Sequence, residues 1–363
     1  MSSSKTRTGN YFEDFRLGQR FVHATPRTLT DADQSLYIAL TGSRACLHSA
    51  DPVARAAGQR GRPLDDLLVF NTAFGKTVPD LSLNAVANLG YAEMRFNQPV
   101  FNGETLSVQS DVIGLKENSN RRSGVVYVRS TARNQHGQTV LSWVRWVMVH
   151  KRDATAACGE TVIPTLQAQV DTAALAALAA ERFDHRAALV TQSTGVTDLW
   201  EDYAVGERID HPAAMAINHS DHSLATRLYQ NTAKAHFDAH GMARSPMGQR
   251  LVYGGHIISV CKALAYDGTE NALAILAIHG GSHVSPTFAG DTICCATTVL
   301  DTFDAGSGAS VGGVRLRMVG AKNLESASQI VFPAVGQKHA PETVLDLDFT
   351  IALPKRGAAT PNL

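Results

Sequence analysis

Residues 11–23 read YFEDFRLGQRFVH, and residues 199–211 read LWEDYAVGERIDH. The second stretch repeats the first at an offset of 188 positions, with an aromatic residue, a Glu-Asp pair, a glycine, an arginine and a histidine in step. The same offset brings His48 onto His236 without a gap. A single match of this kind could arise by chance, so a second one in the same order is needed to establish a repeat.

That second match lies further along the chain. PVFNGETL at 99–106 corresponds to PTFAGDTI at 286–293 at an offset of 187. Two matches in the same order indicate that one domain occurs twice. We predict a first copy at residues 10–153, a second at 197–354, and a linker at 154–196 that is partly helical because it contains an alanine-rich stretch.

Each copy shows the same order of elements. A helical stretch (31–48 or 219–238) precedes a more apolar helix, DDLLVFNTAFGKTV or RLVYGGHIISVCKALAY. Long segments of alternating polarity follow and predict antiparallel strands; they are LSVQSDVIGL, SGVVYVRSTARN and TVLSWVRWVMVHK in the first copy, and DTICCATTVLD, GGVRLRMVGAKN and ETVLDLDFTIAL in the second. The sequence therefore predicts an α+β double hot-dog fold, in which a curved antiparallel sheet wraps an apolar helix in each copy.

Composition narrows the function classes. The 363 residues are 44% hydrophobic and 18% charged with a formal net charge of zero, which gives no electrostatic reason to expect nucleic acid or an anionic membrane as a partner. The five cysteines lack CxxC spacing, as expected in a reducing compartment. The opening MSSSKTRTGN has no apolar region and the chain has no run of 18 apolar residues, so we expect a cytoplasmic protein.

Asn231 and His236 are the first candidates for chemistry. They lie five positions apart, about 140° around an ideal helix, so they converge only if the helix starts or bends near Asn231. Ser43 and His48 occupy the same two positions in the first copy. A histidine that recurs beside a polar residue points to a site, although a lone histidine more often belongs to a core or a surface.

Tyr253-Gly254-Gly255-His256 precedes the apolar run IISV and is the second candidate. Two glycines allow a ligand to approach the backbone, and free N–H groups at a helix start can stabilise a developing oxyanion. The alternative is a helix start shaped only for packing. The first copy has Phe70-Asn71 near the matching place and lacks the glycine pair, so we expect the second copy to be catalytic and the first to be a scaffold.

These residues resemble a known family. The signature of the MaoC-like, (R)-specific enoyl-CoA hydratases, Y-x-x-L-[ST]-G-D-x-N-P-x-H, is similar to residues 37–48, where Tyr37, Leu40, Gly42 and His48 fit and Ser43 stands at the aspartate position. The second copy keeps the histidine and has Asn231 at that position. The family segment V-H-G-x-L is similar to Val252-Tyr253-Gly254-Gly255-His256-Ile257.

A closer resemblance extends over nearly the whole chain. GNYFEDFRLGQRFVHATPRTLT, NLGYAEMRF, RWVMVHKRD, ATRLYQNTAKAHF and LVYGGHIIS resemble the mesaconyl-CoA hydratases, also called β-methylmalyl-CoA dehydratases. The resemblance implies a lyase that reversibly adds water to mesaconyl-CoA to give β-methylmalyl-CoA, in carbon assimilation. The substrate is an acyl-CoA thioester, so no separate cofactor is expected.

Hydration of a conjugated thioester needs a base for water and donors for the enolate oxygen. We assign the base to His236, water orientation to Asn231 and the oxyanion donor to the Gly254 N–H. For substrate binding we expect the residues around them, namely Tyr253, Gly255, His256, Arg227 and Tyr229. Arg227 or Arg44 could bind a free carboxylate, and Arg95 or Lys76 could meet coenzyme A phosphates.

Three other readings stay open. A hot-dog thioesterase would use a carboxylate, which both candidate positions lack. A non-catalytic acyl-CoA-binding module is compatible with the altered signatures, and a dehydratase of citramalyl-CoA or another hydroxyacyl-CoA would differ only in pocket shape. The histidines show neither HxH nor HExxH spacing, so no metal is predicted. Two fused copies already form a pseudo-dimer, and a homo-oligomer is possible.

Overall fold

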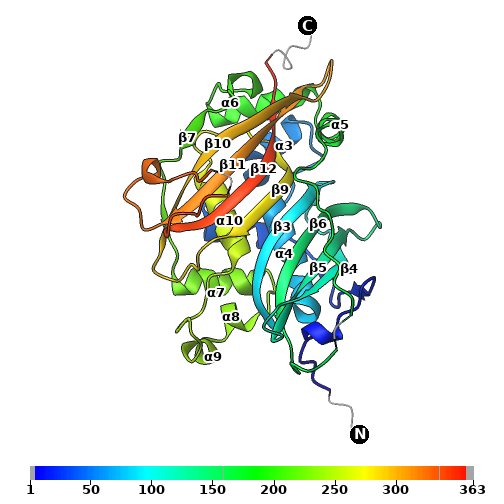
Figure 1. The fold of residues 1–363 in the computed structure, drawn as a ribbon. Coiled ribbons are helices and arrows are strands. Elements are labelled where there is room, and N and C mark those ends of the chain that lie inside the picture. The colour runs from blue at the N-terminus through cyan, green and yellow to red at the C-terminus, as the bar shows by residue number, and fades with distance from the viewer. Residues whose placement is uncertain (1–4, 158, 335, 357–363) are drawn as a thin grey trace.

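A single antiparallel sheet organises the molecule. The computed structural model describes residues 5–157, 159–334 and 336–356, and in this part of the chain twelve strands form one sheet (Figure 1). The strand order is β1-β4-β5-β6-β3-β9-β12-β11-β10-β7, with β2 beside β4 and β8 beside β10. The order of the second half mirrors that of the first, as expected for two copies of one domain.

The elements follow the predicted repeat. The first half contains η1 (Phe12–Asp14), β1 (Arg20–Val22), β2 (Arg27–Thr28), α1 (Asp31–Thr41), α2 (Cys46–Ser49), α3 (Asp51–Ala56), α4 (Asp66–Leu81), β3 (Ala85–Phe96), β4 (Thr105–Glu117), β5 (Ser123–Arg133) and β6 (Thr139–His150). The second contains η3 (Trp200–Asp202), β7 (Arg208–Asp210), β8 (Met215–Ala216), α7 (His219–Leu228), α8 (Lys234–Phe237), α9 (Ala239–Ala243), α10 (Gly254–Leu264), β9 (Ala274–His283), β10 (Thr292–Asp304), β11 (Val311–Lys322), η4 (Ala327–Gln329) and β12 (Thr343–Pro354). Between them lie α5 (Thr172–Arg182), η2 (His185–Val190) and α6 (Thr191–Thr194).

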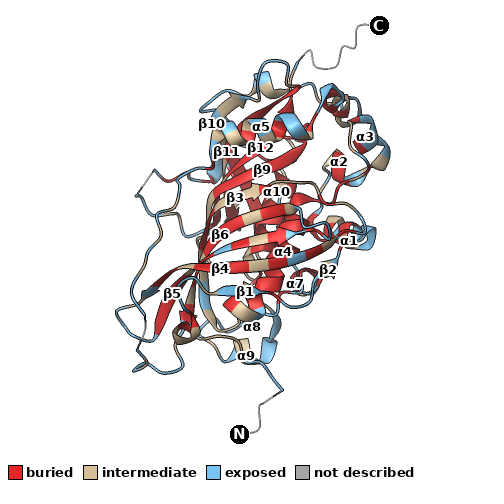
Figure 2. Cartoon of the chain, turned by 90° about the vertical axis from the view of Figure 1, so that its right-hand side faces the viewer, coloured by how far each residue is buried: buried red, intermediate tan, exposed pale blue. Residues whose placement is uncertain are grey.

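The two apolar helices, α4 and α10, lie against the same face of the sheet and touch each other (Figure 1). Nearly every residue of both is buried, because each helix covers one half of the sheet while its other side meets its counterpart (Figure 2). Glycines make the contact close. A Cβ on Gly255 of α10 would lie 2.1 Å from Asn71 Oδ1 of α4. Gly75 of α4 allows an equally close approach of the end of α7, because a Cβ there would lie 1.9 Å from the Tyr229 carbonyl oxygen. This is the double hot-dog arrangement that the sequence predicts.

Strands β3 and β9 join the halves at the centre of the sheet. Tyr91 pairs with Gly281 and Met94 with Ile278 across this antiparallel junction. Neither strand was predicted from the sequence, although both are 10 residues or longer. The junction matters for function because it carries side chains of both halves to one place.

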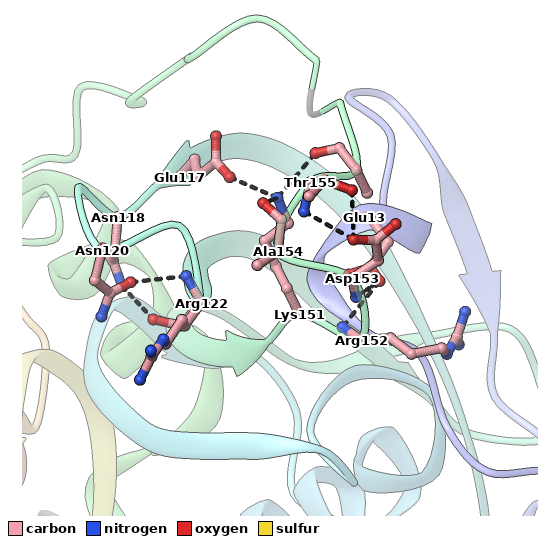
Figure 3. Close-up of polar contacts among 12 residues, drawn as sticks. Glu13, Glu117, Asn118, Asn120, Arg122, Lys151, Arg152, Asp153, Ala154 and Thr155 are labelled. Atoms are coloured by element: carbon pink, nitrogen blue, oxygen red, sulfur yellow. Dashed lines mark hydrogen bonds and ion pairs between the residues drawn. The ribbon is translucent and has the colours of Figure 1, made fainter.

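The glutamate of the repeated Glu-Asp pair links the start of each copy to the end of its last strand by hydrogen bonds. The Glu13 carboxylate accepts hydrogen bonds from the backbone N–H groups of Arg152 and Asp153, just after β6 (Figure 3). In the second copy the Glu201 carboxylate accepts from the Arg356 N–H, just after β12. Equivalent contacts explain why this pattern is the best-matched part of the repeat.

The linker packs against the outer face of the second half-sheet, opposite α10. Helix α5 begins at the N-cap Asp171, whose side chain accepts from the Ala173 N–H, as the alanine-rich stretch led us to expect. Leu175 and Ala179 pack in one apolar cluster with Leu276 and other strand residues. None of the helices in the described ranges combines the length and the hydropathy that a membrane span requires.

Candidate active site

A cavity of about 770 Å³ lies between the two halves. Its walls come from α4, β3 and β6 of the first half and from the α7–α10 segment and the end of β9 in the second. Asn231, His236, Tyr253 and Gly254 all line it, so the structure brings four of the predicted site residues together. No aspartate or glutamate occurs among the described residues that line this cavity.

A break in the helix allows Asn231 and His236 to converge. Helix α7 ends at Leu228, and Gln230 has a φ of 52°, in the left-handed region. The chain turns there, and α8 begins only at Lys234. The two residues therefore do not lie on one straight helix, and the bend that the five-residue spacing required is present.

His236 is held by the backbone. Its Nδ1 lies 3.0 Å from the Leu251 carbonyl oxygen, so Nδ1 carries the proton and Nε2 has the free lone pair. Nε2 makes no hydrogen bond to any residue that the structure describes. Burial lowers the pKa of His236, and the hydrogen bond to the Leu251 carbonyl opposes this shift. At neutral pH the imidazole is therefore neutral and suited to act as a base.

Asn231 offers a donor to the same cavity. Its side chain is buried, and Oδ1 accepts a hydrogen bond of 3.0 Å from the Ala233 N–H at the start of α8. This contact fixes the orientation of the amide and leaves Nδ2 for a ligand. Asn231 can therefore orient a water molecule by donating to its oxygen, but it cannot remove a proton.

The N-terminus of α10 is open toward the cavity. Gly254 is the first helical residue, and the N-cap Tyr253 provides no side-chain cap. Within the described chain neither the Gly254 nor the Gly255 N–H donates a hydrogen bond. Uncapped N–H groups at the positive end of a helix suit a developing negative charge on oxygen. Gly254 is also required by its neighbour, because a Cβ there would lie 2.4 Å from His283 Nε2.

His283 and Tyr91, which the sequence did not reveal as site residues, meet across the central junction. The Tyr91 hydroxyl lies 3.1 Å from His283 Nε2, and both residues line the cavity. Burial, and then the nearby His236, lower the pKa of His283 to about 4. His283 is the last residue of β9, and no local motif marks it. Only the pairing of β3 with β9 brings it to the site.

Arg145 of β6 also lines the cavity and was not predicted. Its side chain is fully buried, and its Nη2 donates to the Thr77 hydroxyl at 2.9 Å and to the Ser82 hydroxyl at 3.4 Å. The guanidinium lies over the Phe74 ring, 4.2 Å from its centre. Burial lowers the pKa of Arg145 to about 10, so the side chain remains charged at neutral pH.

The other predicted substrate-binding residues are divided between the cavity and the core. Tyr253 lines the cavity with its ring 5.5 Å from that of His236, and its hydroxyl is buried without a partner in the described structure. Gly255 faces α4. His256 and Tyr229 are buried outside the cavity wall, with the Tyr229 hydroxyl 3.5 Å from His256 Nδ1.

A second cavity, of about 500 Å³, adjoins the first at Asn231. Arg27, Lys76 and Arg227 line it, which makes it basic. Lys76 donates to the Thr25 hydroxyl at 3.3 Å and also bonds Gln230. Arg95 lines neither cavity.

The first copy has an equivalent site that is nearly closed. His48 Nδ1 bonds the Pro63 carbonyl oxygen at 3.2 Å, which repeats the contact of His236. The cavity beside Ser43 and His48 measures only about 30 Å³. Asp65 is the N-cap of α4, and its side chain accepts from the Leu67 N–H. The helix start that is open in the second copy is therefore capped by a carboxylate in the first.

The structure also corrects the match predicted between the first copy and Tyr253-Gly254 of the second. Asp65-Asp66, and not Phe70-Asn71, match Tyr253-Gly254, because each pair spans the N-cap and first residue of its helix. Asn71 instead lies within α4, where its Nδ2 donates to Ser259 Oγ of α10 at 2.9 Å. The first copy still lacks a glycine at this position, because Asp66 stands where the second copy has Gly254. In the described part of the chain no three His, Cys, Asp or Glu side chains are grouped to hold a metal ion.

Comparison with known proteins agrees with the fold and shows the family. A family model described as mesaconyl-CoA hydratase matches residues 2–328. The β-methylmalyl-CoA dehydratase of Chloroflexus aurantiacus is 46% identical over 98% of this chain and 100% of its own length. A crystal structure of a MaoC domain dehydratase from the same organism is also 46% identical, with a TM-score of 0.91 over 98% of this chain and 100% of that one.

A more distant structure confirms the fold alone. A Mycobacterium tuberculosis protein described as a double hot-dog has a TM-score of 0.73 at 22% identity, over 95% of this chain and 99% of its own. The match of the family model over most of the sequence, together with the full-length relative, settles the classification. The chain belongs to the mesaconyl-CoA hydratase family.

Proposed function

We propose that this protein is a lyase that reversibly adds water to mesaconyl-CoA to give β-methylmalyl-CoA. One observation carries the proposal: His236, with a free Nε2, lines the same cavity as the open helix start at Gly254. This is the pair of functions that hydration of a conjugated thioester needs, a base and an oxyanion site. The relative named β-methylmalyl-CoA dehydratase supports the choice of substrate.

The reaction begins with water held between two side chains. Asn231 Nδ2 donates to the water oxygen, and the water donates to His236 Nε2. As the oxygen bonds to the β carbon of the acyl group, its proton passes to Nε2. The double-bond electrons move toward the thioester, and its oxygen becomes an enolate that accepts from the Gly254 N–H.

The reaction ends with protonation of the α carbon. The imidazolium of His236 returns the proton there, which restores the thioester carbonyl and the neutral base. The scheme assigns both transfers to His236, because the usual family aspartate is replaced by Asn231 and no carboxylate lines the cavity within the described residues. His283, whose Nε2 lies 3.1 Å from the Tyr91 hydroxyl, is another imidazole that lines the cavity, but its lowered pKa leaves it without a proton to give at neutral pH.

Coenzyme A enters the proposal as part of the substrate, and no further cofactor is expected. The basic cavity around Lys76 and Arg227 adjoins the reaction site at Asn231, so we assign the coenzyme A portion to it. The first copy supplies walls of the acyl cavity through α4, β3 and β6 and has no role in proton transfer.

The test uses the purified chain and synthetic mesaconyl-CoA. Hydration predicts loss of the conjugated thioester absorbance and a product heavier by one water, with no free thiol. Release of thiol would identify a thioesterase instead. Binding without conversion would favour an acyl-CoA-binding module, and faster conversion of another enoyl-CoA would move the assignment to a different dehydratase.

A further inference from the structure

Arg145 is a buried cation without an anionic partner. Its exposed fraction is 0%, and it belongs to no ion pair in the described structure. Only neutral hydroxyls, of Thr77 and Ser82, accept from its Nη2. Its Nε and Nη1 are buried and have no hydrogen-bond partner among the described residues.

Such an arrangement is unfavourable in the free protein. A buried charge is normally paired, because its lost hydration must be replaced by an opposite charge and by hydrogen bonds. The Phe74 ring lies against the guanidinium, and the nearby Tyr91 and Tyr253 hydroxyls are neutral because burial raises the pKa of each. The cavity wall at this end therefore presents positive charge that an incoming anion can neutralise.

A second unpaired donor lies in the same part of the cavity. The Tyr253 hydroxyl is buried and has no partner in the described structure. The Tyr253 and Phe74 ring centres lie 5.6 Å apart. The Arg145 guanidinium stacks on the Phe74 ring, so Phe74 lies between the two unpaired donors. The Tyr253 ring also lies 5.5 Å from the His236 ring, so one of the two residues with an unpaired donor is beside the proposed base.

We propose that Arg145, assisted by the Tyr253 hydroxyl, binds the free carboxylate of the acyl group and so selects dicarboxylic over monocarboxylic enoyl-CoA thioesters. The proposal rests on the proposed function, in which the substrate is the monothioester of a dicarboxylic acid. In β-methylmalyl-CoA the free carboxylate is attached to the carbon that carries the hydroxyl. A receptor for it must therefore line the same cavity as the base, as Arg145 does.

The two arginines that the sequence suggested as carboxylate receptors, Arg44 and Arg227, lie outside the large cavity. Arg44 pairs with Asp267 and lies over the Tyr266 ring, at the nearly closed cavity of the first copy. Arg227 is exposed and lines the second, basic cavity. Arg145 is the guanidinium that lines the large cavity in the described structure, and it comes from the half that lacks the proposed base.

The experiment compares two substrates in two variants. Tiglyl-CoA has the carbon skeleton of mesaconyl-CoA with a methyl group in place of the free carboxylate. For Arg145→Met we expect kcat/KM with mesaconyl-CoA to fall by about 10²- to 10³-fold, as for loss of one partner of a buried charge pair. The slow reaction with tiglyl-CoA should remain or increase. Arg145→Lys should recover part of the activity with mesaconyl-CoA, because it keeps the charge.

Stability provides an independent readout. Because Arg145 is unpaired in the free protein, Arg145→Met should leave the melting temperature of the ligand-free chain unchanged or raise it. The control is Arg129→Met on the neighbouring strand β5, an exposed arginine paired with Glu93, which should leave the ratio of the two substrates unchanged.

An unchanged substrate ratio in a folded Arg145→Met variant would overturn the inference and leave the proposed function intact. A lower melting temperature with equal losses on both substrates would also overturn it, since Arg145 would then be structural. If the unaltered chain fails to hydrate mesaconyl-CoA, the proposed function fails. The inference then stands only if another carboxylate-bearing enoyl-CoA is hydrated in an Arg145-dependent way.

Discussion

At the scale of single residues, the orientation of His236 determines what can be tested. Its Nδ1 bonds the Leu251 carbonyl, so replacement by glutamine keeps a donor in that region and removes the base. We expect His236→Gln to lower kcat for hydration by about 10²- to 10⁴-fold, the usual contribution of a positioned base. Binding of the substrate, measured by calorimetry, should change little. Turnover that survives within a few-fold would exclude His236 as the base.

The same residue sets the acid limit of activity. Neutral His236 is the active form, and burial lowers its pKa below the ordinary value for histidine. Activity should therefore persist as the pH falls through about 6.5, the unperturbed value, and decline only at lower pH. A profile of kcat/KM against pH measures this limb directly. A decline that begins above pH 7 would mean that another group controls it.

The site residues that could be predicted from the sequence lie within one stretch of chain, whereas those that could not come from distant strands. Asn231, His236 and Gly254 stand out because a repeat or a glycine pair marks them within one stretch of chain. Arg145 and His283 come from strands far apart in the sequence, and each resembles an ordinary strand residue. Their proximity is a property of strand pairing, which local patterns do not encode.

At the scale of elements, the start of helix α10 at Gly254 leaves no space for a side chain. Gly254→Ala keeps the N–H but places a Cβ against His283 Nε2, so the helix or the imidazole must move. Displacement of about 1 Å at a reacting group can cost about 10²-fold, and we expect a loss of kcat of this size.

A matched glycine provides the control. Gly159 is exposed, and a Cβ there meets nothing within 4 Å, so Gly159→Ala should leave kcat and the melting temperature unchanged. Equal kinetics for the two alanine variants would show that the approach of His283 to the helix has no catalytic importance.

The elements themselves were only partly predictable. Strand β4 alternates in burial over most of its length, and β5, β6, β11 and β12 do so over part of theirs, where one face meets a helix and the other is less buried. Strand β9 begins with six buried residues, since α10 covers one face and the linker covers the other. Its apolar run lacks a period of two, and β3 contains several register shifts, so the pattern that identifies strands is absent.

At the scale of the whole molecule, duplication has produced one site from two related halves. The cavity of about 770 Å³ beside His236 contrasts with about 30 Å³ beside His48, which is room for little more than a water molecule. The first copy keeps the histidine and its carbonyl contact, but its helix start is occupied by Asp65. It contributes instead the walls of its partner's cavity, including Arg145.

This asymmetry predicts opposite results for the same substitution in the two copies. His48→Gln removes an imidazole that is buried against Pro63 and faces no space for an acyl group, so kcat should stay within about threefold of the unaltered chain. The free energy of unfolding should change by no more than about 1 kcal/mol, the net contribution of one buried hydrogen bond, because glutamine keeps a donor near the Pro63 carbonyl oxygen. His236→Gln should instead lower kcat by about 10²- to 10⁴-fold with little change in stability, because its imidazole faces the open cavity. Parallel urea unfolding and mesaconyl-CoA assays separate these effects. A catalytic loss in folded His48→Gln as large as that in His236→Gln would mean that both halves supply reacting groups, and that the closed first cavity opens during turnover.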